Sequence, residues 1–110
     1  MKQSTQSQNK RKIKVVVADD HPVFLEGVVS LLGEMEEVKV VDTALNGSQV
    51  IQLLNDNDVD VVITDINMPG MDGIALCQKI KKSYAHIKVL VLTITRVPLF
   101  FKINLKSLDI

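Results

Sequence analysis

The stretch VVITDINMPGMDG, Val61 to Gly73, decides how this chain folds. Its first residues form an apolar run typical of a buried strand, and that run ends on the carboxylate of Asp65. Pro69 and the two glycines then predict a sharp turn away from the carboxylate. Because a buried carboxylate is costly unless it is paired or bound to a metal, an acid at this place indicates a functional site.

The composition is that of one domain. The 110 residues are 46% apolar and 24% charged, which supports a modest core. Thirteen basic residues balance thirteen acidic ones, so no overall field favours nucleic acid. The single cysteine, Cys77, excludes an internal disulfide and is expected to be a packing residue. No apolar run is long enough to span a bilayer, and we expect a cytoplasmic location without membrane contact.

Apolar β-branched runs alternate with helical patterns along the chain. We expect strands over Ile13–Ala18, from Val38, over Val59–Thr64 and from Ile87. The positions that mark the three intervening helices are Val23, Phe24, Val28, Leu31 and Leu32, then Val50, Ile51, Leu53 and Leu54, then Ile74, Cys77, Ile80 and Lys81. Strands that are apolar on both faces imply a parallel sheet between layers of helices.

Acidic residues follow the first and third strands. Asp19 and Asp20 end the first strand, and Asp65 ends the third. If the strand order is the common 2-1-3-4, these strands are neighbours about 4.8 Å apart and their acids converge. Three carboxylates this close repel one another, and the usual remedies are a raised pKa or a divalent cation with oxygen ligands, of which Mg²⁺ suits the site.

The other titratable residues named below are expected to have structural or solvent-facing roles and not to belong to the site. Asp56, Asp58 and Asp60 lie at the opposite end of the third strand and are expected to be solvated. Asp42, in an edge strand, is expected to be structural. The two histidines have no metal-ligand spacing and are expected in loop or cap roles: His21 and His86.

Three segments, VVVADDHPVFLEGVVSLL, VVITDINMPGMDGIALCQKIK and IKVLVLT, carry a family resemblance. In this order and spacing they resemble the receiver domain of bacterial two-component response regulators, closest to the branch that continues into a LuxR-type helix-turn-helix. The resemblance covers Ile13 to about Thr95. It implies a flavodoxin-like, doubly wound α/β fold with the parallel strand order 2-1-3-4.

The resemblance also implies residue roles. Asp65 would accept a phosphoryl group from a sensor histidine kinase or a small phosphodonor, without turnover of an external substrate, so the chain is not expected to be an enzyme. Asp20, helped by Asp19, would bind Mg²⁺ together with Asp65 and the main-chain oxygen of Asn67. Thr93 would be the switch hydroxyl that turns towards the acyl phosphate.

The chain departs from the family pattern after Thr93. The family continues with a fourth helix, a fifth strand ending in a lysine, and a fifth helix, and Lys102 and Lys106 lie too early to be that lysine. We therefore expect a disordered basic arm over 1–12, a truncated receiver domain over 13–95 and an atypical apolar tail over 96–110. The fold would be incomplete, without its fifth strand and last helices, and without DNA contact by this chain.

Three functions remain open on these grounds. The first is a phosphoryl-accepting signalling domain, and the second is a switching-deficient interaction module that retains only Mg²⁺ binding. A hydrolytic phosphatase is the weakest, because Asn67 stands where a second acid would be needed.

The apolar tail needs a partner surface. It could form an antiparallel hairpin turning near Arg96 to Pro98, pack as a helix over the exposed sheet face, or insert into a neighbouring subunit. The last two bury more apolar surface than a lone hairpin, so we expect a symmetric homodimer formed through the truncated edge and the tail.

Overall fold

The computed structural model describes residues 11–96 and 101–107, with the main chain alone from residue 93 onward. The strands are β1 (Ile13–Ala18), β2 (Val38–Ala44), β3 (Val61–Asp65), β4 (Lys88–Arg96) and β5 (Phe101–Ser107). The helices are α2 (Pro22–Gly33), α3 (Gly47–Asp56) and α4 (Gly73–Ser83). The expected alternation of strands and helices is confirmed, with strand ends shifted by a few residues.

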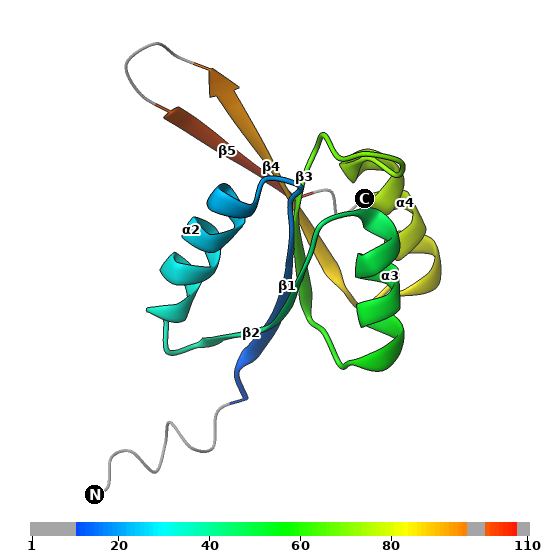
Figure 1. Ribbon diagram of the computed structural model, residues 1–110. Helices are drawn as coiled ribbons and strands as arrows, with labels where there is room; N and C mark the ends of the chain where they lie inside the picture. The colour runs from blue at the N-terminus through cyan, green and yellow to red at the C-terminus, as the bar shows by residue number, and fades with distance from the viewer. Residues whose placement is uncertain (1–10, 97–100, 108–110) are drawn as a thin grey trace, which may run out of the picture.

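The sheet has the order β2-β1-β3-β4-β5. Its first four strands are parallel, as predicted, with Ala18 level with Thr64 and Asp65 level with Leu92. Helix α2 lies on one side of this sheet, and α3 and α4 lie on the other (Figure 1). The chain is therefore a doubly wound α/β domain, in which the carboxyl ends of the parallel strands meet at one edge.

Alternate residues of the strands fill two apolar layers. Val16, Val62 and Val91 face α3 and α4, where they pack with the fully buried side chains of Leu76 and Ile80. On the other face, Val15, Val17, Ile63 and Leu92 pack with Leu25 of α2. Because successive side chains point to opposite faces, one valine-rich strand serves both layers.

The buried faces of α2 and α4 agree in part with the predicted ones. Predicted positions that pack in the core are Phe24, Val28, Leu32, Cys77 and Ile80, whereas Lys81 is exposed. Val23 and Leu31 are 84% and 67% exposed, and Leu25 instead lies at the centre of the α2 face. At ~100° per residue, Leu31 lies about 120° and Val23 about 160° around the helix axis from Leu25. On α4, Ile74 is 40% exposed for the same reason, since the face is formed by Leu76, Cys77 and Ile80.

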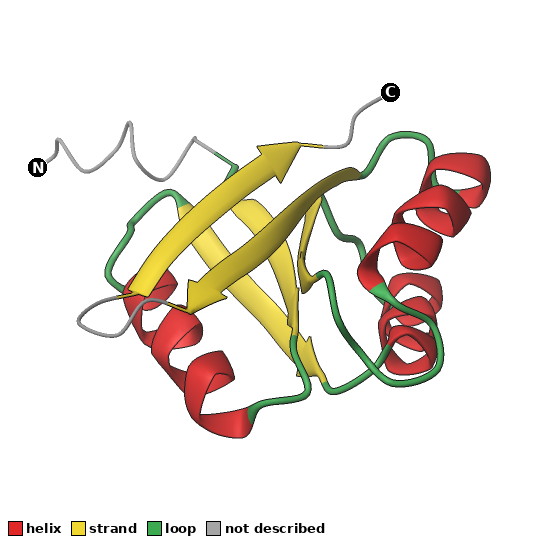
Figure 2. Cartoon of the chain, turned by 90° about the horizontal axis from the view of Figure 1, so that it is seen from above, coloured by secondary structure: helices red, strands yellow, loops and turns green. Residues whose placement is uncertain are grey.

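The sheet does not end at β4, although the strand that follows is not the parallel fifth strand of the family. β5 pairs antiparallel with β4, from Leu90 opposite Ser107 to Arg96 opposite Phe101 (Figure 2). The hairpin, which we ranked below a packed helix or subunit exchange, is the arrangement found. An antiparallel return needs only a short connection, whereas a parallel return needs a dozen or more residues. The predicted turn near Pro98 lies outside the described residues.

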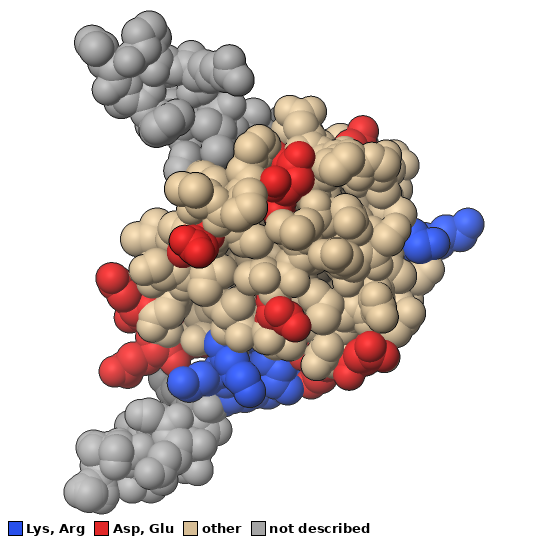
Figure 3. All heavy atoms as spheres, in the orientation of Figure 1, with Lys and Arg blue, Asp and Glu red and all other residues tan. Residues whose placement is uncertain are grey.

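Ion pairs join the amino-terminal ends of β1 and β3. Arg11, which the sequence placed in the basic arm, donates two hydrogen bonds of 3.1 and 2.9 Å to the carboxylate of Asp60. Lys14 bonds to Asp58 at 2.8 Å, and its main-chain N–H donates to Asp60. In Figure 3, Lys and Arg side chains gather beside acidic ones at the end of the molecule where β1 begins. Asp58 is exposed, as expected, although it is ion-paired, whereas Asp60 is partly buried and hydrogen-bonded rather than simply solvated.

The ion pairs of Arg11 and Lys14 hold the pKa values of the Asp58 and Asp60 carboxyl groups below their usual range. The main cause is the hydrogen bond from Lys14 for Asp58 and the hydrogen bond from Arg11 for Asp60. Asp56 at the end of α3 is exposed, as expected. Among the described helices, none is both long and apolar enough to cross a membrane.

Candidate functional site at the carboxyl ends of β1 and β3

Parallel pairing of β1 and β3 brings the predicted acids to one edge of the sheet. Ala18 and Thr64 are level in the register, so the residues that follow them, Asp19 and Asp65, leave the two strands side by side. The main-chain N–H of Asp19 still donates to the carbonyl of Ala44, which extends the pairing with β2 by one residue. The edge is therefore rigid where the carboxylates leave it.

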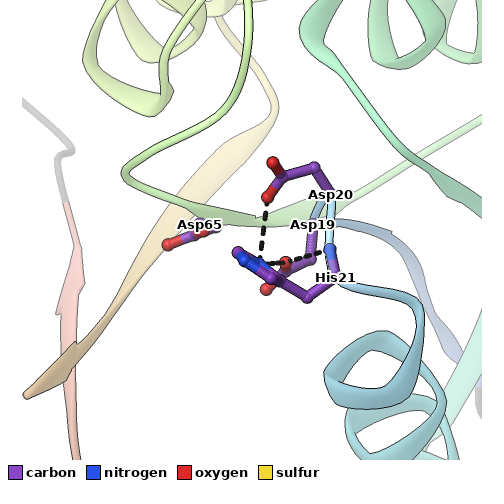
Figure 4. Close-up of side chains that lie close together, drawn as sticks. All are labelled: Asp19, Asp20, His21 and Asp65. Atoms are coloured by element: carbon purple, nitrogen blue, oxygen red, sulfur yellow. Dashed lines mark hydrogen bonds and ion pairs between the residues drawn. The ribbon is translucent and has the colours of Figure 1, made fainter. Parts of the chain in front are cut away.

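The four side chains in Figure 4 form one cluster: Asp19, Asp20, His21 and Asp65. Each offers a ligand atom, and these atoms all lie within 4.8 Å of one another. Asp19 is 2% exposed, whereas Asp65 is only half-buried. Asp65 can therefore be reached by an incoming molecule, as can the half-buried Asp20 and the exposed His21, whereas Asp19 cannot.

The turn after Asp65 depends on glycine at two positions. Gly70 has φ +77°, a left-handed conformation that side-chain-bearing residues rarely adopt. Gly73 donates its main-chain N–H to the carbonyl of Ile66, and it begins α4 directly beneath the Asp65 main chain. Asp72 caps this helix by accepting a hydrogen bond from the N–H of Ala75. The loop thus folds back without covering the carboxylate.

Gly73→Ala is expected to lower the free energy of unfolding by about 1–3 kcal/mol, the usual cost of forcing atoms into a filled space. A Cβ at this position would lie 2.5 Å from the Asp65 carbonyl oxygen and 2.8 Å from the Ile66 Cα, both main-chain atoms. Urea denaturation checks the loss. Gly27→Ala in α2 is the matched control: its Cβ meets nothing within 4 Å, so it should stabilise by about 1 kcal/mol through helix propensity. Equal effects of the two changes would contradict the close approach.

Comparison with known proteins decides the family. The sequence profile of the response regulator receiver domain matches residues 15–106. The chain belongs to the response regulator receiver domain family. Among its relatives, the transcriptional regulatory protein DegU of Brevibacillus brevis is 37% identical over 86 residues, which are 78% of this chain and 36% of DegU.

Other relatives agree with this placement. Response regulator GacA of Pseudomonas aeruginosa is 37% identical over 82 residues, covering 74% of this chain and 38% of GacA. The receiver domain of the NarL response regulator from Mycobacterium tuberculosis superposes with a TM-score of 0.74 at 36% identity, covering 81% of this chain and 72% of that one. The relatives are of the predicted NarL type. The chain spans 36% and 38% of the length of the two curated relatives named here.

Burial and charge act on Asp65 of this receiver domain in the same direction. Desolvation raises the pKa of the Asp65 carboxyl, and repulsion by Asp19 raises it further. Hydrogen bonding by the main-chain N–H groups of Asn67 and Ile66 opposes both effects. The Asp65 carboxylate is therefore held beside other negative charge without a cationic Lys or Arg among the causes of its shift.

His21 is the residue of the cluster that the sequence analysis missed. Its main chain occupies the N-cap of α2, but its side chain makes no capping hydrogen bond. Instead Nδ1 lies 2.9 Å from Oδ1 of Asp19 and 3.0 Å from Oδ1 of Asp20. The hydrogen bond with Asp19 and the charge of Asp20 raise the pKa of the ring. The signal was present in the sequence, where His21 follows the acidic pair directly.

The donor set fits a hard divalent cation. Oδ1 of Asp20 is buried and accepts no hydrogen bond from the described residues, and its one close partner is Nδ1 of His21 at 3.0 Å, an ion pair when the ring is protonated. A buried carboxylate oxygen without a hydrogen bond is expensive, and carboxylates at this spacing are what Mg²⁺ accepts in proteins. The predicted ligands Asp19, Asp20 and Asp65 are thus together in the receiver domain.

Two other predicted residues are placed by the main chain. Asn67 is exposed and lies two residues beyond Asp65, with its N–H directed at that carboxylate. Thr93 lies in β4, one residue beyond the level of Asp65 and opposite Asn104 of β5, and its side chain is outside the described part of the chain. Their roles stay predictions.

Asp42 and His86, for which a structural role and a loop or cap role were expected, lie outside the cluster. The Asp42 carboxylate accepts a hydrogen bond from the main-chain N–H of Thr43, the residue after it. His86 is exposed in the connection between α4 and β4. Neither belongs to the Asp19–Asp20–His21–Asp65 cluster.

Proposed function

We propose that the chain is a phosphoryl-accepting domain of a two-component system, in which Asp65 is phosphorylated in a Mg²⁺-dependent reaction by a sensor histidine kinase or a small phosphodonor. The observation that carries this proposal is the convergence of Asp65, half-exposed, with the buried Asp19 and with Asp20. Membership of the receiver family supports it. The regulation of transcription, which the name of DegU records, belongs to the same proposal for the whole protein.

In the proposed reaction a carboxylate oxygen of Asp65 attacks the phosphorus of the donor in line. The new oxygen–phosphorus bond forms while the bond to the donor breaks, and the donor leaves with that electron pair. Asp19, Asp20 and the main-chain oxygen of Asn67 would hold Mg²⁺ beside Asp65. The bound cation supplies positive charge to the phosphoryl oxygens. Thr93 would then donate its hydroxyl to one of those oxygens.

Intact-mass spectrometry after incubation with a small phosphodonor and Mg²⁺ tests the proposal. One phosphoryl group per chain is expected with Mg²⁺, and none is expected with excess chelator. Equal labelling in both conditions would exclude the cation from the reaction, and no labelling in either would refute phosphoryl acceptance.

A second candidate is an interaction module that binds Mg²⁺ but does not switch. The antiparallel direction of β5 favours it, because the resemblance implies a parallel fifth strand ending in a lysine at this edge. Mg²⁺ binding without phosphate incorporation, in the same experiment, would support this second function.

We also propose a homodimer and a cytoplasmic location. A solved structure similar to this chain holds two RcsB dimers bound to two parallel DNAs; it has a TM-score of 0.73 at 36% identity and is spanned over 48% of its length. β4 is paired with β5 inside this chain, so the edge of β4 is not free to pair with a second copy. The proposed dimer therefore does not form through that edge. Sedimentation velocity over a wide concentration range is expected to show a dimer, and a monomer at every concentration would refute it.

A further inference from the structure

The loop that leaves Asp65 is held on the body of the domain by two methionines. Met68 is 7% exposed, belongs to the apolar layer beside α3 and α4, and accepts a 3.8 Å hydrogen bond at Sδ from the hydroxyl of Thr64. Met71 is partly buried and packs against the same layer. The other residues of this stretch are exposed: Asn67, Pro69, Gly70 and Asp72. The contacts of Met71 therefore fix the far end of the loop.

The side chain of Met71 lies against Gly47, the first residue of α3. A Cβ at position 47 would lie 2.9 Å from Cβ, 3.0 Å from Sδ and 3.2 Å from Cγ of Met71. Because the nearest of these atoms is Cβ and not the flexible end of the side chain, a residue larger than glycine would force one of the two segments to move. Among the described glycines only Gly70 has a positive φ, so the backbone of Gly47 does not itself require glycine. The close approach of Met71 does.

The segment before Gly47 is tied to the acidic cluster. The carbonyl of Ala44, the last residue of β2, accepts the main-chain N–H of Asp19 at 3.0 Å. Gly47 follows Ala44 three residues later. Met71 therefore rests on the same connection that holds the main chain of Asp19.

Asn67 is the loop residue whose main chain faces the site. Its N–H donates to the carboxylate of Asp65, and in the proposed function its carbonyl oxygen is a Mg²⁺ ligand. The N–H of Gly73 donates to the carbonyl of Ile66 at 2.9 Å, which closes the loop on itself. A shift at Met71 is passed to Asn67, since both residues lie inside this closed loop.

We propose that Met71 is a positioning residue of this site: its contact with Gly47 sets where the main chain of Asn67 lies relative to Asp65. The inference rests on the proposed function and adds to it the residue that holds one Mg²⁺ ligand in place. Mg²⁺ demands near-ideal octahedral geometry at about 2.0–2.1 Å, so it loses affinity when a ligand is displaced.

Gly47→Ala and Met71→Ala test the contact from its two sides, because the first displaces the methionine and the second removes it. Gly27→Ala is the matched control for the glycine, since its Cβ meets nothing within 4 Å. Met35→Ala is the matched control for the methionine, since Met35 is 48% exposed. Titration calorimetry with Mg²⁺ on the full chain is expected to show about tenfold weaker binding in each test variant and unchanged binding in each control.

The amide resonance of Asn67 reports the position of the loop without any metal. In ¹⁵N–¹H correlation spectra of the metal-free chain, this resonance should shift in Gly47→Ala and Met71→Ala and stay in place in both controls, because a hydrogen bond weakens with small displacements of its donor. Met71→Leu keeps the Cβ and most of the side-chain volume. It should therefore return both the Asn67 resonance and the Mg²⁺ affinity towards those of the unmodified chain.

The outcomes separate this inference from the proposed function. An unchanged Mg²⁺ affinity in both test variants would overturn the inference, even if the Asn67 resonance moved. Equal losses in the test and control variants would also overturn it, because they would reflect a general loosening of the fold. If the unmodified chain binds no Mg²⁺, the proposed function fails, and the Asn67 resonance alone then decides whether Met71 positions this loop. Circular dichroism establishes that each variant is folded.

Discussion

Asp65→Asn is expected to abolish phosphate incorporation, because an amide offers no carboxylate nucleophile to the donor. Asp65 is half-buried, like Asp20, and the turn with Gly70 and Gly73 leaves it open to a donor. Intact mass after exposure to phosphodonor and Mg²⁺ should show one phosphoryl group on the unmodified chain and none on the variant. Borohydride trapping followed by peptide mass spectrometry locates the group.

Asp56→Asn is the matched control, since Asp56 is an exposed acid at the end of α3. It should accept phosphate like the unmodified chain. Phosphate on the Asp65→Asn variant at any other residue would contradict the assignment of Asp65 as the sole acceptor.

The same Asp65→Asn variant should be more stable than the unmodified chain at neutral pH in the absence of metal. Burial and Asp19 raise the pKa of Asp65 in the folded state, so the folded chain binds that proton more tightly than the unfolded chain. The free energy of unfolding therefore falls as the pH rises from the pKa of Asp65 in the unfolded chain to its higher pKa in the folded chain. Above both pKa values the free energy of unfolding stays at the lower level. Urea midpoints with chelator should favour the variant at neutral pH, and the difference should disappear below about pH 4. A variant less stable at neutral pH would show that the main-chain bonds to the carboxylate outweigh the repulsion.

Asp20→Asn is expected to weaken Mg²⁺ binding at least about tenfold, equivalent to ~1.4 kcal/mol. The buried Oδ1 of Asp20 accepts no hydrogen bond from the described residues, so it has the most to gain from a cation. Removing its charge also relieves repulsion with the neighbouring carboxylates, so the metal-free fold should be as stable as before or more stable. Titration calorimetry gives the affinity and urea denaturation the stability.

Asp42→Asn is the control for this change. Asp42 bonds to the main-chain N–H of the next residue and lies outside the cluster, so Mg²⁺ affinity should be unaffected. Equal Mg²⁺ affinity for Asp20→Asn and the unmodified chain would remove Asp20 from the metal site.

Local sequence determined the elements and the edge of the sheet at which the acids meet. Alternating β-branched runs and helical patterns predicted the parallel strands, and a right-handed parallel topology then places the ends of β1 and β3 together. The closeness of Asp19 and Asp65 follows from the pairing of these two strands alone. These features depend on short-range periodicity and on one topological rule, both of which can be read along the chain.

Tertiary structure decided what depends on long-range contact. In α2, Leu25 is buried and Val23 is exposed. This choice depends on how the helix is placed over the sheet, which is set by the tertiary packing. Arg11 reaches Asp60 only because β1 and β3 are adjacent, 49 residues apart in sequence. β5 pairs antiparallel with β4 because the open edge of β4 offers unpaired main-chain groups and the connection is too short for a parallel return. The ring of His21 contacts Asp19 and Asp20, its neighbours in sequence, whereas Asp65 joins the same cluster only because the fold places β3 beside β1.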